Sequence, residues 1–255
     1  MALLMWEHSL ANASDLVVGG ASAGGLAVYL HADRWRDRLP VARVSALPDS
    51  GFFLAVDAVG GWRDDATDDA MDDASLPAPL LTQQRTGAVG PALITQPSLE
   101  PGRYATDMRS LARLANVSSG LNPACVSELG GADCFFAQNA ARFLRTPTFA
   151  LQSVFDSWQT KNEMAPGAEA NVSAVNAYGA RVSATLHAAL LGAGRPNGAF
   201  VDACAHHCFK WGDISIRGDV QAAAFAAWYA GENGPRRLWQ QNDSFPCASC
   251  CHAAV

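Results

Sequence analysis

The 255-residue sequence lacks any apolar run close to the roughly 18 residues that a membrane-spanning helix needs, which argues against a transmembrane span. It is also short of positive charge, because 18 Lys and Arg are outnumbered by 24 Asp and Glu and the net charge is -6. No group of basic residues is dense enough to indicate nucleic-acid binding. Residues 1–8 contain no basic segment, and Glu7 and His8 interrupt their apolar run, so the chain as given shows no signal peptide.

Cysteine, by contrast, is abundant, and its seven residues are many for a cytosolic enzyme of this size. N-glycosylation sequons begin at Asn12, Asn116, Asn171 and Asn242. Together these features favour a secretory, oxidising compartment. The sequence therefore predicts a secreted glycoprotein whose N-terminal part lies outside the sequence given.

A glycine-rich stretch near the N-terminus contains the pattern G-x-S-x-G at Gly20–Gly24, with Ser22 at its centre. A strand-like run precedes it and a helix-like run follows it, which is the context of a nucleophile elbow. The residues two before and two after such a strained serine are expected to be small. The following helix directs its free N–H groups at the serine, so the backbone N–H of Ala23 is predicted to be an oxyanion-hole donor. The alternative is a glycine-rich turn with an incidental serine.

Strand-like and helix-like segments alternate along the rest of the chain. We expect strands at 16–18, 41–47, 148–154 and 198–203, the last strand, and helices at 26–38, 104–116, 137–144, 171–192 and 219–230. This alternation predicts an α/β fold with a mostly parallel sheet flanked by helices, in one domain over residues 1–255. Residues 57–103 are acidic and Pro-rich and indicate an insertion or long loop. Their paired aspartates favour a solvated face, because the spacing is not that of a calcium loop.

Candidate catalytic side chains follow three of the expected strands. Ser22, Asp156 and a histidine at 206 or 207 occur in the chain order of α/β-hydrolase triads. In this chemistry an imidazole takes the serine proton, and a carboxylate holds the imidazole in the correct tautomer. Adjacent residues past a strand point apart, so only one of His206 and His207 is expected to serve. Taken alone, Asp156 would more often be a helix N-cap.

Two further features admit alternatives. The aromatic residues Phe52 and Phe53 either line a pocket near the elbow or simply cap the core. The soft ligands gathered late in the chain could hold structural zinc, but the C-x3-C spacing is not the usual zinc pair and disulfides are favoured. These ligands are Cys204, His206, His207, Cys208, Cys247, Cys250, Cys251 and His252.

The order and spacing of these motifs resemble a known family, the plant pectin acetylesterases and the related Notum-type carboxylesterases. The matching stretches span most of the chain. They are Gly-Gly-Ala-Ser22-Ala-Gly-Gly-Leu, Leu30-His31-x-Asp33, Asp49-Ser-Gly-Phe-Phe-Leu54, Asn122-Pro-Ala-Cys125, Cys134-Phe-Phe-Ala-Gln138, Phe155-Asp156-Ser-Trp-Gln159, Cys204-Ala-His-His207-Cys208, Trp228-Tyr229 and Pro246-Cys247-x-x-x-Cys251-His252.

The resemblance implies a serine carboxylic-ester hydrolase with Ser22 as nucleophile, Asp156 as acid and His207, three residues after Cys204, as base. It implies no metal or organic cofactor. The implied substrate is an acyl ester, which in the plant branch is an acetylated polysaccharide such as pectin, and the implied location of the full-length protein is extracellular or in the cell wall. The alternatives are a Notum-like protein deacylase and a non-catalytic glycan- or acyl-binding remnant. The oligomeric state stays open.

The sequence also departs from the family pattern. Family members carry further strands and a Gly-Gly-Trp-Cys loop before the serine, whereas 21 residues precede Ser22 here, so the expected fold is an N-terminally truncated α/β-hydrolase. Ala21 and Ser244 stand where family members have cysteine. The expected disulfides are Cys125 with Cys134, across a Gly-Gly turn, and links from Cys204 and Cys208 to the tail cysteines Cys247 and Cys251.

Overall fold

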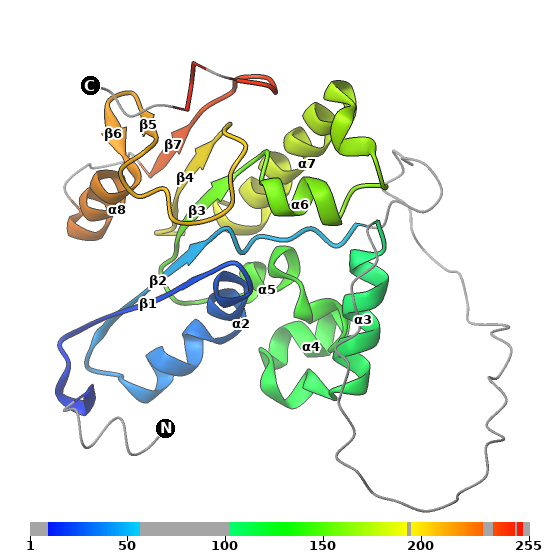
Figure 1. Cartoon of the computed structure of the whole chain (residues 1–255). Helices are drawn as coiled ribbons and strands as arrows, with labels where there is room; N and C mark the ends of the chain where they lie inside the picture. Colours follow the sequence, from blue (N-terminus) through cyan, green and yellow to red (C-terminus); the bar gives the residue numbers. More distant parts are fainter. Residues whose placement is uncertain (1–9, 57–101, 193–194, 232–236, 248, 252–255) are drawn as a thin grey trace, which may run out of the picture.

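The computed structural model describes residues 10–56, 102–192, 195–231, 237–247 and 249–251. In this part of the chain a five-stranded sheet runs through the molecule with helices on both faces (Figure 1). The strand order is β1-β2-β3-β4-β7, and every neighbouring pair is parallel. The strands are β1 (Asp15–Ala21), β2 (Arg43–Asp49), β3 (Phe149–Ser153), β4 (Gly198–Asp202) and β7 (Leu238–Gln240). The α/β fold expected from the alternating pattern is therefore confirmed.

Helices of different length connect these strands. They are α2 (Ala23–Arg38), α3 (Tyr104–Leu114), α4 (Pro123–Leu129), α5 (Ala137–Phe143), α6 (Ser157–Asn162), α7 (Val172–Leu190) and α8 (Gln221–Ala230). Short 3-10 turns occupy Leu10–Asn12, Val117–Gly120, Asp133–Phe135 and Ala168–Ala170, and a two-stranded antiparallel hairpin joins β5 (Ser215–Ile216) to β6 (Asp219–Val220).

The two faces of the sheet carry side chains of different size because successive strand residues point to opposite faces. Small residues such as Ala46, Ala150 and Ala199 lie in the larger apolar cluster, which includes residues of α2, α3, α5 and α7. Bulky residues such as Phe149 and Phe200 lie in a second cluster with α8. Strands β2, β3 and β4 are thus covered on both faces, whereas the edge strand β1 is partly exposed, with Val17 39% exposed. The carboxyl ends of the parallel strands open onto loops at one edge of the sheet.

Two expectations about the elements were wrong or incomplete. Gly198–Asp202 is not the last strand, because Leu238–Gln240 pairs with it in parallel as β7. This three-residue strand is too short for its alternation to stand out from the polar residues around it. Helix α4 was not expected, although Asn122 caps it by accepting from the N–H groups of Ala124 and Cys125. Most of the acidic and Pro-rich segment 57–103, with its calcium alternative, lies outside the described residues.

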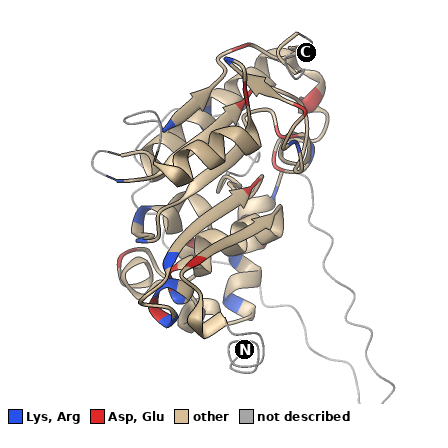
Figure 2. Ribbon diagram, turned by 90° about the vertical axis from the view of Figure 1, so that its left-hand side faces the viewer, with Lys and Arg blue, Asp and Glu red and all other residues tan. Residues whose placement is uncertain are grey.

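The described residues also bear on three expectations, which concern membrane spans, surface charge and glycosylation. None of the helices in the described ranges is both long and apolar enough to cross a membrane. In the view of Figure 2, Lys and Arg are interspersed with Asp and Glu along the ribbon. All four sequon asparagines, Asn12, Asn116, Asn171 and Asn242, are exposed.

The disulfides agree with the expectation in part. Cys125 and Cys134 form the expected bridge, and Cys204 is linked to the tail through Cys251. Two details differ: Cys247 pairs with its neighbour Cys250, and Cys208 is a free, buried thiol. The Cys208 thiol interacts instead with the Ser50 hydroxyl and the Ser22 backbone, and the backbone at Cys208 has a positive φ of 61°. Burial raises the pKa of this thiol.

Candidate active site

Ser22 occupies the turn between β1 and α2 in strained geometry. Its φ of 55° and ψ of -123° lie in a region that residues with side chains rarely adopt. The Ser22 N–H donates to the backbone carbonyl of Asp49 at the end of β2, 2.9 Å away, which ties the turn to the sheet. Ala23 is the first residue of α2, so its N–H has no acceptor within the helix. This is the backbone geometry of a nucleophile elbow.

The glycines around Ser22 differ in how tightly they are enclosed. A Cβ added at Gly20 would lie 2.4 Å from the carbonyl oxygen of Gly24, and one at Gly25 would lie 2.6 Å from that of Asp49. A Cβ added at Gly24 would meet nothing within 4 Å, so the expectation that both flanking glycines are sterically required holds for Gly20 alone. The difference arises because β1 and α2 cross most closely at Gly20, whose backbone faces that of Gly24.

Asp156 lies three residues after β3 and has two partners at once. Its Oδ1 accepts from the N–H groups of Trp158 and Gln159 at 2.9 and 3.0 Å, so the residue is the N-cap of α6. His207 Nδ1 lies 2.8 Å from Oδ2 and 3.0 Å from Oδ1, and the carboxylate is completely buried. Asp156 is therefore both the N-cap of α6 and the hydrogen-bond partner of His207. The capping N–H groups hold the carboxylate in the orientation that meets His207.

His207, and not His206, is the histidine that meets Asp156. It belongs to the segment 203–208 after β4, which we call the histidine loop, and its side chain is 21% exposed. In the described part of the chain its ring bonds to Asp156, and no hydrogen bond joins it to the Ser22 hydroxyl. Serine–histidine bonds are often loose in ligand-free enzymes and tighten when substrate binds.

Two residues at the end of β2 connect the serine turn to the histidine loop. The Ser50 hydroxyl accepts from the N–H of Cys208 at 2.9 Å, and the Asp49 carboxylate accepts from the N–H of Phe209 at 2.9 Å. Ser50 Oγ also donates to Asp49 Oδ1, and the Asp49 carbonyl holds the N–H of Ser22. In the sequence, Asp49 and Ser50 were identified only as part of the stretch 49–54 that resembles the family, with no role of their own. Their polar side chains directly after a strand were the signal of a structural role at this edge of the sheet.

The extended segment that follows Ser50 brings the aromatic ring of Phe53 close to His207. Side chains from three other elements accept its backbone N–H groups: Gln152 from Phe52, Glu163 from Leu54 and Gln138 from Ala55. The ring centroids of Phe53 and Trp158 lie 6.5 and 6.3 Å from that of His207. Phe52 instead packs edge-on against Tyr29 in the core. Of the two alternatives for these aromatics, core packing describes both, because Phe52 and Phe53 are buried in the same apolar cluster. Phe53 differs in that its ring also lies beside His207.

A second histidine–carboxylate pair precedes the first. His206 Nε2 lies 3.0 and 3.2 Å from the two carboxylate oxygens of Asp202, the last residue of β4. In the sequence, His206 was a candidate base or zinc ligand, and Asp202 was assigned no role. In the structure, four of the cysteines weighed as zinc ligands, Cys204, Cys247, Cys250 and Cys251, are engaged in two disulfides.

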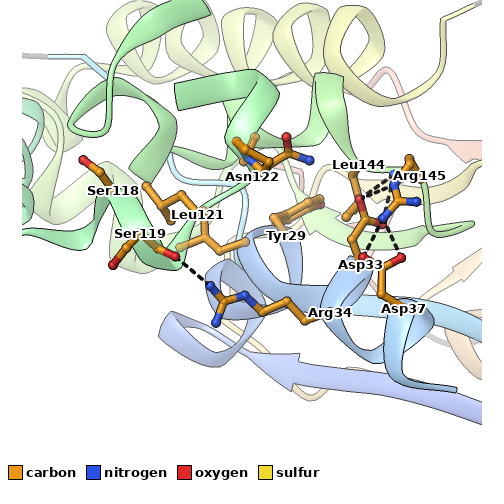
Figure 3. Close-up of a pocket in the computed structure, with 13 residues that line it drawn as sticks. Tyr29, Asp33, Arg34, Asp37, Ser118, Ser119, Leu121, Asn122, Leu144 and Arg145 are labelled. Atoms are coloured by element: carbon orange, nitrogen blue, oxygen red, sulfur yellow. Dashed lines mark hydrogen bonds and ion pairs between the residues drawn. The ribbon is translucent and has the colours of Figure 1, made fainter. Parts of the chain in front are cut away.

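A cavity of about 340 Å³ lies elsewhere, between α2 and the α4–α5 region (Figure 3). Asp33 of α2 accepts from the N–H groups of Arg145 and Thr146 and from the Thr146 hydroxyl. The Arg145 guanidinium in turn binds Asp37 at 2.7 Å. These bonds hold the turn that leads into β3. The charged side chains of Asp33, Asp37 and Arg145 are thus paired with one another and support the sheet.

The parallel sheet, the strained serine between strand and helix, and the histidine–carboxylate pair define an α/β-hydrolase type of fold. Among solved structures, the Wnt deacylase Notum from Drosophila in crystal form II matches with a TM-score of 0.67 and 20% sequence identity, covering 98% of this chain and 63% of that chain. Crystal form I of the same protein matches with a TM-score of 0.62 and 21% identity, covering 93% of this chain and 59% of that chain.

A sequence profile described as Pectinacetylesterase matches residues 2–67 and 95–252. The chain therefore belongs to the pectinacetylesterase family. Pectin acetylesterase 11 of Arabidopsis thaliana is 26% identical over 251 residues, covering 91% of this chain and 50% of that protein. Pectin acetylesterase 5 of the same plant is 21% identical over 282 residues, covering 98% and 56%. The chain thus spans about half the length of these curated relatives.

Proposed function

We propose that this chain carries the catalytic residues of a serine carboxylic-ester hydrolase, which removes acetyl groups from pectin or a related acetylated polysaccharide. The observation that supports this most directly is the bond between His207 Nδ1 and the buried Asp156 carboxylate, in a loop tied to the strained turn at Ser22. A carboxylate on Nδ1 leaves Nε2 unprotonated and able to accept the serine proton. The exposed sequons and the disulfides support a secreted setting as part of the same proposal.

The proposed reaction has two halves. Ser22 Oγ attacks the acetyl carbonyl carbon while His207 Nε2 takes the hydroxyl proton, and Asp156 stabilises the imidazolium that forms. When the tetrahedral intermediate collapses, the bond to the sugar oxygen breaks and His207 returns the proton to that oxygen. Water then attacks the acetyl-serine with His207 as base, which releases acetate and restores Ser22.

The oxyanion of each intermediate needs hydrogen-bond donors. The free N–H of Ala23 at the start of α2 is the donor that we assign, because a helix N-terminus stabilises negative charge. Loss of one such donor costs ~10²–10³ in turnover in comparable enzymes. The turnover number of this chain therefore depends on how many donors its oxyanion hole contains.

A protein deacylase acting on a longer acyl group is the second candidate. The half-buried ring of Trp158 lies beside His207, and the buried rings of Phe53 and Tyr104 pack against it with centroids 5.2 and 6.0 Å away. Aromatic side chains of this kind suit an acyl chain as well as they suit a sugar face. A comparison of p-nitrophenyl acetate with p-nitrophenyl octanoate separates the two, because a preference for octanoate would favour the deacylase.

The test of the esterase proposal is hydrolysis of p-nitrophenyl acetate and release of acetate from acetylated pectin by the chain and by its Ser22→Ala variant. We expect measurable turnover that the substitution abolishes, and equal rates for the two proteins would refute the assignment. Covalent labelling by a fluorophosphonate probe separates the third possibility, a non-catalytic glycan- or acyl-binding remnant. A remnant would bind acetylated pectin without reacting with the probe, whereas the proposed enzyme reacts at Ser22.

A further inference from the structure

The pair formed by His206 and Asp202 is built into the interior and takes no part in the reaction proposed above. The His206 side chain is 8% exposed and that of Asp202 is fully buried. Nε2 of His206 bonds to Asp202, whereas its Nδ1 is buried and has no hydrogen-bond partner among the described residues. A buried polar atom without a partner is costly, so such a group in a folded protein calls for an explanation.

The surrounding bonds connect this pair to both members of the pair that we assign to catalysis. Asp202 also accepts from the N–H of Cys204 at the start of the histidine loop, 3.1 Å away. The backbone carbonyl of His206 accepts from the N–H of Ser157 at 3.0 Å, and Ser157 directly follows Asp156. The His206 ring is therefore fixed to the end of β4, and its main chain is fixed to the start of α6.

Nearby carboxylate charges strengthen the hydrogen bond between His206 and Asp202 when the ring is protonated. Three carboxylates act on the His206 ring: Asp202 directly, and Asp156 and Asp49 through the Coulomb attraction of their charges. Burial alone would lower the pKa of this imidazole, but the hydrogen bond to Asp202 and the attraction of the three carboxylates raise it above its usual value. When the ring is protonated, its bond to Asp202 is charge-assisted and therefore stronger than a neutral one.

We propose that His206 is a positioning residue, whose hydrogen bond to Asp202 holds the histidine loop so that the His207 ring meets Asp156. The inference rests on the proposed roles of Ser22, Asp156 and His207. Since His206 and His207 are adjacent, loss of the anchor displaces the base itself. A displacement of about 1 Å at a reacting group can cost ~10²-fold in rate.

Two variants test the proposal. His206→Ala removes the bond to Asp202, whereas His206→Gln places an amide N–H near the position of Nε2 and keeps the bond without a titratable ring. We expect kcat per active site to fall by about 10²-fold in His206→Ala with KM changed less than about twofold, and to return to within about fivefold of the wild-type value in His206→Gln. The folded fraction of each protein is measured by circular dichroism, so that unfolded protein does not contribute.

A second readout does not depend on turnover. The proton shared by His207 Nδ1 and Asp156 is followed by its low-field proton resonance, which Asp156→Asn identifies by abolishing it. We expect this resonance to broaden or shift in His206→Ala and to be preserved in His206→Gln. Unchanged resonance and unchanged kcat per folded molecule in His206→Ala, even with a lower melting temperature, would overturn the proposal. Equal losses in both variants would also overturn it. Absence of esterase activity in the wild type would instead refute the proposed function, and the resonance would still test the positioning.

Discussion

Asp156 performs two tasks with one carboxylate, and substitutions can separate them. Asp156→Asn keeps an oxygen that can accept from the N–H groups of Trp158 and Gln159, so α6 retains its cap. With that oxygen engaged, the amide NH₂ occupies the position of Oδ2, which lies 2.8 Å from His207 Nδ1 in the wild type. An amide donor there requires Nδ1 to accept, which puts the ring proton on Nε2. A His207 protonated on Nε2 cannot take the proton of Ser22.

The structure thus predicts different magnitudes for the two tasks. For Asp156→Asn we expect a loss of about 10⁴-fold in kcat, the cost of the wrong tautomer in a serine triad, which corresponds to about 5.5 kcal/mol of transition-state stabilisation. The free energy of unfolding should change by less than about 0.5 kcal/mol, because Asn and Asp cap helices equally well. Asp156→Ala should lose the same activity and also about 1–2 kcal/mol of stability.

The chain offers a matched control for the capping effect. Asn171 caps α7 with the same pattern, accepting from the N–H groups of Ser173 and Ala174 at 3.0 and 3.1 Å. Asn171→Ala should cost about 1 kcal/mol of stability and leave esterase activity unchanged. Esterase assays and urea denaturation of the three variants decide the matter. Near-normal activity in Asp156→Asn, or a stability loss as large as that of Asp156→Ala, would refute the division of tasks.

Two further predictions concern the elbow and a buried acid. Gly20→Ala should lower the melting temperature strongly, because its Cβ would meet the Gly24 carbonyl, whereas Gly24→Ala should fold normally; equal melting temperatures would contradict the steric argument. Burial raises the pKa of the Glu163 carboxyl well above its usual range, although Tyr178 and Leu54 donate to it. The stabilising effect of its raised pKa is complete below the unfolded pKa and is lost as pH rises through the folded value, so stability falls by up to ~1.4 kcal/mol per pH unit in between. Glu163→Gln should therefore be more stable than wild type at pH 8 but not at pH 4, and a pH-independent difference in denaturation midpoints would argue against a neutral Glu163.

The sequence by itself determined the features that depend on neighbouring residues. The alternation of strand-like and helix-like segments predicts the parallel α/β sheet, because the spacing of apolar residues in each segment indicates whether it is a strand or a helix and which face is buried. The elbow at Ser22 is readable because small residues beside the serine are the direct consequence of a tight strand-to-helix turn. The caps at Asp156 and the bridge between Cys125 and Cys134 are local as well, with partners within a few residues along the chain.

Only the tertiary structure decided what depends on residues far apart in the chain. From the residues alone, His206 and His207 were equivalent. The structure distinguishes them, because the His206 ring bonds to Asp202 and the His207 ring bonds to Asp156. The orientation of the loop depends on bonds that Asp49 and Ser50 accept from residues 160 and 158 positions further on. Local patterns do not encode such contacts, because they form only when the carboxyl ends of β2, β3 and β4 come together at one edge of the sheet.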